Sequence, residues 1–475
     1  MHCYRLALMT LLLGAGAARA QGPPPPAAAD VAPTATPDTR LSWHGVTLYG
    51  LIDLGVQYQT HGAPANDYLP YTTSPVVQKT SNHSVTAFTS NNLGYSKIGL
   101  SGFEPLNPEW AVVFKLETLF NPTSGQLTDS LKSLTQNNGK LPTAQSANQD
   151  GSVAGQLFGN AAYIGLSSHH FGTLTFGREY TLLSEEGVRI YDPMQDGRAS
   201  AHAFSLLGGS GTTAGGGDTE NKRLDRIVKY SAQFNWLHLG ALYQLGKGSG
   251  SADTAIQAQL GASLGKASLD AFYTKKYDAV AASAMNPGQV SGLADLCAAN
   301  PQHCFSIDNS VAATISDNTA YALMGLYDFG GPKLYAGYEH ISYANPRTPL
   351  EAGDSIIGGY VLAYVNNSAY VKQRVLQVFW SGIKWPVTKA LELTASYYGY
   401  RQNSFATGSN EGCTGNQSSG CSGRENAFAA LADYRFTRRF DVYFGTFWTG
   451  VQDGLANGFT HTSTLTTSFG MRFAF

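Results

Sequence analysis

The chain has 475 residues, enough for two or three soluble domains or for one β-barrel of about 16 strands at the roughly 10 residues that a spanning strand needs. Only 13% of its residues are charged, against about 25% in an average soluble domain, whereas Gly (53) and Tyr (26) are frequent. The formal net charge is -2 and no basic block occurs, which argues against nucleic acid as a partner.

The first twenty residues have the pattern of a secretory signal peptide. Arg5 supplies positive charge, Leu6 to Ala17 form an apolar stretch, and Ala18-Arg19-Ala20 is a small-x-small cleavage pattern. A transmembrane anchor is the alternative, but the apolar stretch is shorter than the roughly 20 residues of a spanning helix. We therefore expect residues 1–20 to be removed, residues 21–40, rich in Pro and Ala, to form a linker, and residues 41–475 to form the folded domain.

From Val46 onward the hydrophobic pattern has a period of two. In Val46 to Tyr58, apolar side chains at even positions alternate with polar ones such as Asp53. A soluble β-sandwich also alternates, but its strands average about 5 to 6 residues, whereas these segments run to about 10 or more. Turns are short on one side and loops long on the other, which indicates a closed transmembrane barrel, apolar outside and polar inside. The charged side chains expected to face the lumen are Asp53, Lys97, Lys115, Glu117 and Lys229.

The pattern predicts seventeen strand segments, one too many for a bacterial barrel with an even number of strands. The weakest, 356–366, is assigned to a loop. The other sixteen are 46–58, 93–103, 109–118, 157–167, 172–180, 225–235, 237–246, 255–265, 267–278, 317–329, 332–344, 372–385, 390–402, 425–436, 439–450 and 464–475.

Four cysteines remain once Cys3 has left with the signal peptide, and an even count in an exported protein suggests disulfides. The sequence allows three pairings, and the Gly, Asn, Ser and Pro residues around each close pair favour local bridges. A four-thiolate zinc site is the alternative, but its usual spacing of about two to four residues between paired cysteines is absent. No metal site and no cofactor are expected. The disulfide candidates are Cys297, Cys304, Cys413 and Cys421.

Seven stretches of the chain carry a resemblance to a known family. They are VTLYGLIDLGVQY at residue 46, NNLGYSKIGLSG at 91, FGTLTFGRE at 171 with YDPMQDGR at 191, RLDRIVKYSAQF at 223, LADYRFTRRFDVYFGTFW at 431, and the final GMRFAF. Together they resemble the general (non-specific) porins of Gram-negative bacteria, nearest to the beta-proteobacterial type. Thr437, Arg438 and Arg439 depart from the family's usual Ser-Lys-Arg, and the family's His near the end is missing.

The resemblance implies an all-β fold, a 16-stranded antiparallel transmembrane β-barrel with short periplasmic turns, long extracellular loops and an inward-folded third loop. It also implies an outer-membrane homotrimer, surrounded by lipid, through which small hydrophilic solutes and ions diffuse passively. In that family a terminal Phe with alternating hydrophobic residues is read by the outer-membrane assembly machinery. The matching residues here are Phe469, Phe473 and Phe475.

The resemblance further implies a pore constriction, in which acidic residues of the inward loop face basic residues of the barrel wall. Arg178 shares parity with Leu174 and Phe176, so it would point to lipid unless a β-bulge intervenes. Arg189 and Arg198, in the same loop, could pair with the loop carboxylates. The matching wall residues are Lys97, Arg178, Arg223 and Lys229, and the matching loop residues are Glu185, Glu186, Asp192 and Asp196.

An outer-membrane enzyme is the rival from another class. The adjacent His169 and His170 could serve a hydrolase, but they fall in a predicted short turn. The Gly-rich run 208–217 lacks the ending of a phosphate-binding loop, and no Gly-x-Ser-x-Gly elbow occurs. We therefore expect no enzymatic activity. A substrate-specific channel for sugars or organic acids, or an adhesin with a plugged lumen, remain the alternatives that keep the barrel.

Overall fold

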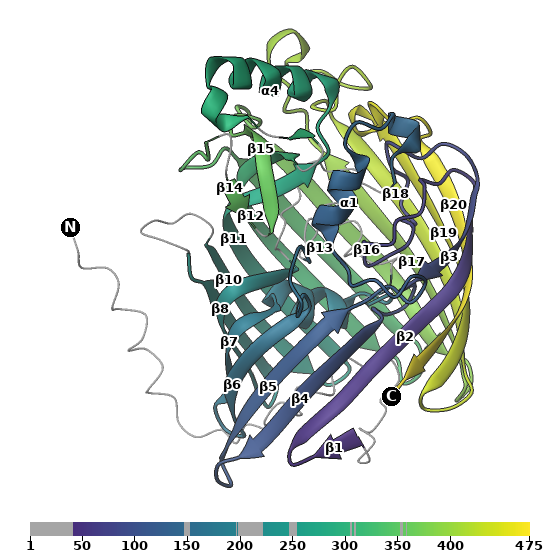
Figure 1. The fold of residues 1–475 in the computed structure, drawn as a ribbon. Coiled ribbons are helices and arrows are strands. Elements are labelled where there is room, and N and C mark those ends of the chain that lie inside the picture. Colours follow the sequence, from purple (N-terminus) through teal and green to yellow (C-terminus); the bar gives the residue numbers. More distant parts are fainter. Residues whose placement is uncertain are drawn as a thin grey trace, which may run out of the picture.

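The computed structural model describes residues 41–146, 153–195, 197, 222–246, 254–304, 306–307, 310–351, 355–357 and 359–475. The expected signal peptide, the expected linker, Asp196 and Arg198 lie outside the described residues. The strands are tilted and wrap around a single axis (Figure 1).

Sixteen antiparallel strands of the described chain close into a barrel, which confirms the predicted fold class. The last strand pairs with the first, with Phe473 opposite Ile52, so that no edge of the sheet is left open. The strands are β2 (Val46–Gln59), β4 (Lys97–Pro105), β5 (Trp110–Leu119), β6 (Ala161–Ser168), β7 (Gly172–Tyr180), β8 (Arg223–Phe234), β9 (Leu237–Gln244), β10 (Ala255–Leu264), β11 (Ala267–Ser283), β12 (Val311–Asp328), β13 (Lys333–Ala344), β16 (Arg374–Pro386), β17 (Leu391–Gln402), β18 (Gly423–Arg435), β19 (Phe440–Asp453) and β20 (Ser463–Ala474).

Two short strands, β1 and β3, pair with the first strand of the barrel, β2. β3 (Val85–Ser90) pairs with the second half of β2, and β4 pairs with the first half, so β3 and β4 together flank one side of β2. β1 (Ser42–Trp43) folds back on the start of β2. The sequence pattern predicted β4 but not β3.

Burial along the strands follows the predicted alternation. In β2, Asp53 and Gln57 are buried on the inner face, whereas Ile52 and Val56 are about two fifths exposed on the outer face. In β5, Lys115 and Glu117 are buried as well. The outer face is therefore apolar and the inner face carries the polar groups, as a membrane-spanning barrel requires.

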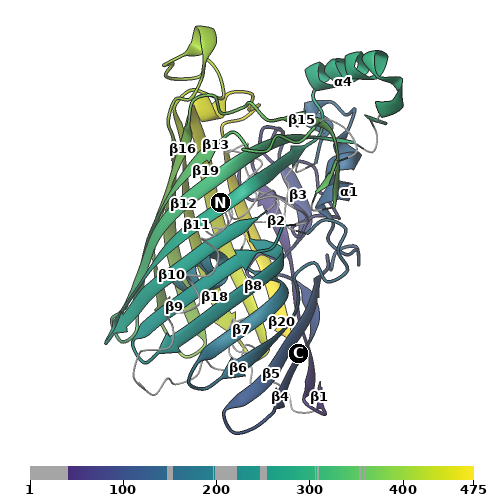
Figure 2. The ribbon, with the colours of Figure 1, turned by 90° about the vertical axis from the view of Figure 1, so that its left-hand side faces the viewer.

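The two ends of the barrel differ. Strands are joined at one end by short turns such as 235–236 and 265–266, and at the other end by long segments such as 403–422. Helix α4 (Pro287–Ala299) lies beyond the long-loop end, and α1 (Ser130–Asn137) lies below it, near β3 (Figure 2). In barrels of this architecture the short turns are usually periplasmic and the long loops extracellular. None of the helices among the described residues is both long and apolar enough to cross a membrane.

The segment 356–366 lies outside the barrel wall, as predicted. It forms a small hairpin of β14 (Ser355–Ile357) and β15 (Tyr360–Asn366), while β13 pairs directly with β16. β11 and β12 extend further than predicted, to Ser283 and from Val311, because they continue to pair beyond an irregularity after Lys276. β15 pairs in parallel with this extension, and the apolar side chains of the extension form a small external core.

The cysteines form one local bridge. Cys413 and Cys421 are joined by a disulfide, with their Cα atoms 5.3 Å apart. The second expected bridge is not present: Cys297 and Cys304 are thiols, and a contact between them raises the pKa of Cys304. Cys297 lies near the end of helix α4, and a 3-10 turn over Pro301–His303 separates it from Cys304. Backbone hydrogen bonds order this segment, so the bridge is not needed to close it.

Candidate functional site

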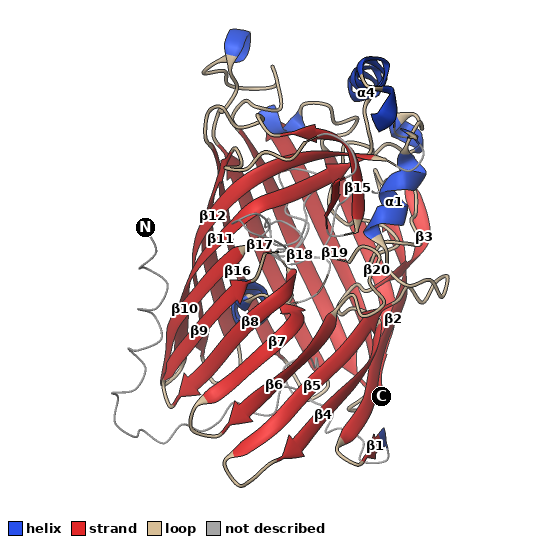
Figure 3. Cartoon of the chain, turned by 60° about the vertical axis from the view of Figure 1, so that its left-hand side comes forward, coloured by secondary structure: helices blue, strands red, loops and turns tan. Residues whose placement is uncertain are grey.

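The segment after β7 folds into the barrel. It forms a helical turn over Leu183–Val188 (η4) that continues into α2 (Arg189–Tyr191). Leu183 and Val188 are completely buried, and a Cβ atom on Gly187 would lie 3.2 Å from side-chain atoms of Phe272 and Met324 on the inner faces of β11 and β12. This helix lies within the ring of strands (Figure 3). We call residues 181–195 the inward loop.

The end of the inward loop is bound to the wall formed by β16 and β17. The indole of Trp380 donates to the Tyr191 carbonyl over 3.0 Å, and the Tyr398 hydroxyl donates to Asp192 over 2.7 Å. Asp192 also accepts from the Met194 amide over 2.8 Å and is fully buried. Asp192 therefore holds the loop on this wall.

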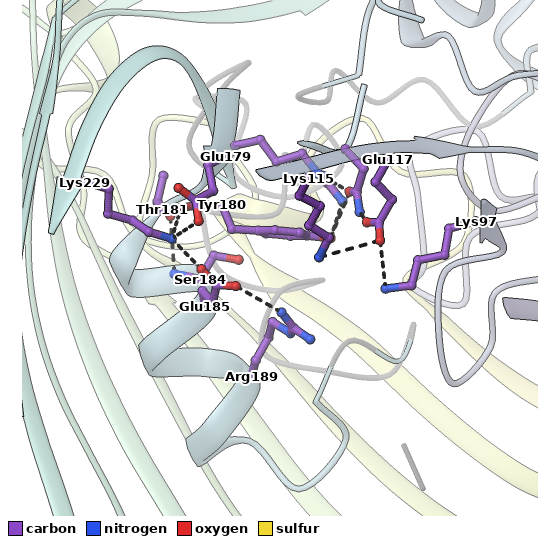
Figure 4. Close-up of polar contacts among 12 residues, drawn as sticks. Lys97, Lys115, Glu117, Glu179, Tyr180, Thr181, Ser184, Glu185, Arg189 and Lys229 are labelled. Atoms are coloured by element: carbon purple, nitrogen blue, oxygen red, sulfur yellow. Dashed lines mark hydrogen bonds and ion pairs between the residues drawn. The ribbon is translucent and has the colours of Figure 1, made fainter. Parts of the chain in front are cut away.

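A first cluster of charges joins the inward loop to β7 and β8. The Lys229 ammonium lies 2.8 Å from Glu179 and also pairs with Glu185 of the loop (Figure 4). The hydroxyl of Thr175 donates to the second oxygen of Glu179 over 2.6 Å. Glu185 also lies 3.7 Å from Arg189, as expected for one of the two loop arginines. The structure thus brings Lys229 and Glu185 together. They form a direct ion pair, whereas the predicted constriction has loop and wall charges that face each other.

A second cluster surrounds Glu117 on the neighbouring wall. Its carboxylate lies 3.5 Å from the Lys97 ammonium and 3.6 Å from that of Lys115 (Figure 4). The same carboxylate accepts from the Tyr49 hydroxyl over 2.7 Å and from the amide of Asn160. Two cations therefore share one fully buried anion.

Arg223 and Tyr180 link the two clusters. The Arg223 guanidinium donates to Asn160 and, over 2.9 Å, to the Tyr180 hydroxyl, and it lies 4.5 Å from the centre of the Tyr180 ring. Arg189 approaches the same ring at 5.5 Å from the loop side. Lys222 stacks at 4.4 Å over Tyr95 close by. These rings hold the guanidinium and ammonium groups in place by cation–π attraction.

Glu186 has an unusual environment within the loop. Its burial, followed by repulsion from the Glu185 carboxylate, raises the pKa of Glu186 to about 7. Asp270 of β11 also raises this pKa, whereas Lys229 and Arg189 lower it. The side chain therefore changes charge near neutral pH, unlike an ordinary Glu.

Arg178 does not face the inward loop. The ladder between β7 and β8 shifts register between Gly177 and Glu179, and Gly177 has a φ of 142°. Arg178 is buried there, donating to the Gly159 carbonyl and pairing with Asp225 at 2.6 Å. The extra residue of this bulge lies in β8, where Asp225 and Arg226 stand opposite Arg178. β7 therefore keeps its alternation, and Glu179 lies on the same face as Thr175, beside Lys229.

Sequence reasoning missed Glu179, Tyr180, Asn160 and Lys222. Strict alternation assigns Glu179 to the inner face with Thr175, so strand parity was the signal that could have found it, but it assigns the buried Tyr180 to the outer face. Asn160 lies in the predicted strand 157–167 but before the start of β6, and Lys222 lies just before β8, outside the predicted strand.

A hydrogen-bonded Ser–His–Asp set lies on the inner face near the short-turn end. His238 contacts Asp270 through Nδ1 and Ser263 through Nε2, each at 3.0 Å. The backbone N–H of Ser263 already donates to the Trp236 carbonyl, so it cannot stabilise an oxyanion.

The adjacent histidines lie in an exposed turn, as predicted, where His170 pairs with Glu109. Hydrogen bonds from Ser168 and His170 lower the pKa of Glu109. Among the described residues, no cluster of His, Cys, Asp and Glu could hold a metal ion.

Comparisons with known proteins agree with this architecture. The family model of Gram-negative porins matches residues 6–448. The chain is 27% identical over 300 residues to an outer membrane porin protein of Bordetella pertussis, and this match covers 62% of the chain but only 63% of that relative's length.

Two solved structures are similar in fold. An anion-selective porin from Comamonas acidovorans is 16% identical, with a TM-score of 0.57 over 90% of this chain and 99% of that chain. A trimer form of OmpT from Vibrio cholerae is 13% identical, with a TM-score of 0.52 over 90% and 99% of the two chains. At such identities the likeness extends to the fold alone.

Proposed function

Because the chain belongs to the Gram-negative porin family, we propose that it forms a water-filled channel through which small hydrophilic solutes and ions cross the outer membrane passively. The inward loop carries this proposal. Its helical part brings Glu185, Glu186 and Arg189 into the barrel beside a charged wall. A constriction requires such charged groups, because they replace part of the hydration that a solute loses in the pore.

The residues proposed to line the constriction come from both clusters. On the wall they are Lys97, Lys115, Glu117, Arg223 and Lys229, and on the loop they are Glu185, Glu186 and Arg189. Asp192 is proposed to anchor the loop, and Asp53 to belong to a separate lumen group, because it accepts from the Leu93 and Gly94 amides and from Tyr443. Arg178 is left out because its partner is Asp225. Asp196 retains its predicted place in the acidic loop.

Single-channel recording in planar bilayers tests the channel directly. We expect steady conductance steps from the purified protein, together with a reversal potential in a salt gradient. Liposome swelling should slow smoothly as neutral solutes grow larger, without preference for one sugar or organic acid. An absence of steady conductance would contradict the channel, and one solute entering far faster than others of its size would favour a substrate-specific pore.

We further propose a homotrimer in the membrane. The support is the fold shared with OmpT, which is described in a trimer form. Light scattering from the protein extracted in mild detergent should report about three times the protomer mass, after correction for detergent. A protomer-sized particle that conducts ions would refute the trimer and leave the channel intact.

The two ends of the chain are proposed to serve export and assembly. The Phe475 ring covers Gly50 so closely that a Cβ atom on Gly50 would clash with it, and the two residues exchange backbone hydrogen bonds of 3.0 and 3.1 Å. Phe469 and Phe473 are about half exposed on the outer face. Deleting Phe475 should lower the amount of folded protein in the membrane, and the intact mass of the mature chain should correspond to a start at Gln21.

We propose that the protein has no catalytic activity. Family membership points to a channel. In the Ser263–His238–Asp270 set, the backbone N–H of Ser263 is already used by the Trp236 carbonyl and cannot stabilise an oxyanion. A fluorophosphonate that labels activated serines should leave the folded protein unlabelled. Labelling that Ser263→Ala abolished would overturn this proposal.

A further inference from the structure

Two arginines stand side by side on the outer face of the barrel near its long-loop end. Arg401 of β17 is the direct cross-strand partner of Arg424 of β18. Both are exposed, whereas their sequence neighbours Tyr400, Gln402 and Glu425 are buried on the inner face. Side chains at directly opposed positions start about 5 Å apart, and like charges placed there destabilise a sheet.

No carboxylate relieves this repulsion within the part of the chain that the structure describes. Arg424 donates through Nε to Gln452 over 2.6 Å, and Arg401 lies 5.3 Å from the centre of the Phe379 ring. Neither arginine has an ion pair among the described residues. Elsewhere at this end of the barrel a carboxylate is available, as for Arg347, which lies 3.9 Å from Asp317. Most guanidinium donors of the arginine pair therefore point outward, available for an anion.

The position of the pair identifies the kind of anion. Below it on the same outer face, Tyr397, Phe428 and Trp448 form a continuous aromatic row, with ring centres 4.9 and 6.0 Å apart. Along β18, the outward side chains between Phe436 and Asn426 span about 25 Å once strand tilt is included, which is the height of the apolar band of such barrels. The arginines come just beyond that band, where lipid headgroups lie.

We propose that Arg401 and Arg424 bind the phosphate group of an anionic outer-leaflet lipid, whose acyl chains lie on the aromatic row below. A phosphate offers oxygens to two guanidinium groups at once, and each such charge-assisted hydrogen bond is roughly twice as strong as a neutral one. Phe379 and Gln452 hold the two guanidinium groups in place for the contact.

Native mass spectrometry of the full-length protein tests the site, with purified diphosphorylated lipid A as the added lipid. The double variant Arg401→Gln/Arg424→Gln should retain at least about tenfold less of this lipid, which is the loss expected for one charge-assisted hydrogen bond. Arg401→Lys/Arg424→Lys should lose less. Arg438→Gln, which removes one exposed charge at the opposite rim, is the matched control and should retain lipid normally.

A second comparison needs no variant. The wild-type protein should retain dephosphorylated lipid A about as poorly as the double variant retains the phosphorylated form. Equal retention of the two lipids, or undiminished retention by the double variant, overturns the proposal. It is likewise overturned if inorganic phosphate alone binds as tightly as the lipid, or if removing the arginines changes only the oligomeric state, since the face would then contact a second copy.

Discussion

The ammonium group of Lys229 lies 2.8 Å from the carboxylate of Glu179, and both side chains are buried on the inner face of adjacent strands. Lys229 also pairs with Glu185, so one residue of the wall joins a strand carboxylate to the inward loop. Removing this single cation would leave the two carboxylates close together without the partner that they share.

We therefore expect Lys229→Met to loosen the inward loop. Breaking a buried ion pair from one side costs about 3 to 5 kcal/mol, because the remaining charge stays desolvated. The variant should unfold at a lower urea concentration and show noisier, larger single-channel currents. Lys333→Met is the control, since Lys333 and Asp328 form an exposed pair at 3.7 Å, which is worth about 0 to 1 kcal/mol. Equal effects of the two variants would contradict the role of Lys229.

Ion selectivity should respond to Glu117. Its carboxylate is shared by Lys97 and Lys115, so Glu117→Gln leaves both cations without their anion. The reversal potential in a salt gradient should then report a higher selectivity for anions. In Lys97→Gln/Lys115→Gln it should report a higher selectivity for cations. Glu104→Gln, which removes an exposed carboxylate near the short-turn end, should change it less. Shifts of the same sign in the first two variants would show that these residues lie away from the ion path.

The current should depend on pH near neutrality. Burial and the Glu185 carboxylate raise the pKa of Glu186 to about 7, so Glu186 is charged above that pH and neutral below it. As the pH falls from about 8 to about 6, the loop loses negative charge. The reversal potential should then report a higher selectivity for anions. Glu186→Gln should behave at all pH values as the wild type does at the acidic end. A pH response that survives this substitution would have to arise from another group.

Cysteine labelling should separate the two pairs. A maleimide added to the native protein should attach to Cys297 and Cys304, which are thiols, and not to Cys413 and Cys421, which are bridged. Reduction and unfolding should add two more labels to the mature chain. A mature protein with no reactive thiol before reduction would mean that the first pair is also oxidised in the cell envelope.

The period-two pattern, together with strands of about 10 residues and the contrast between short turns and long loops, was sufficient to predict the barrel. Strand parity predicts that Asp53, Lys115, Glu117 and Lys229 face the lumen, and all four are buried in the structure. The need for an even number of strands removed 356–366 from the wall. The face of a residue can be read from one strand at a time, and the number of strands from a count along the chain.

Only the tertiary structure decided which charges meet. The register shift between β7 and β8 left Arg178 paired with Asp225, away from the inward loop. The course of the inward loop placed Glu185 on Lys229 and buried Asp192 against Tyr398. The pairing of Arg401 with Arg424 likewise depends on the register between two strands. Bulges, loop paths and register arise from contacts between residues far apart in the chain, and the hydrophobic pattern of a single strand carries no record of them.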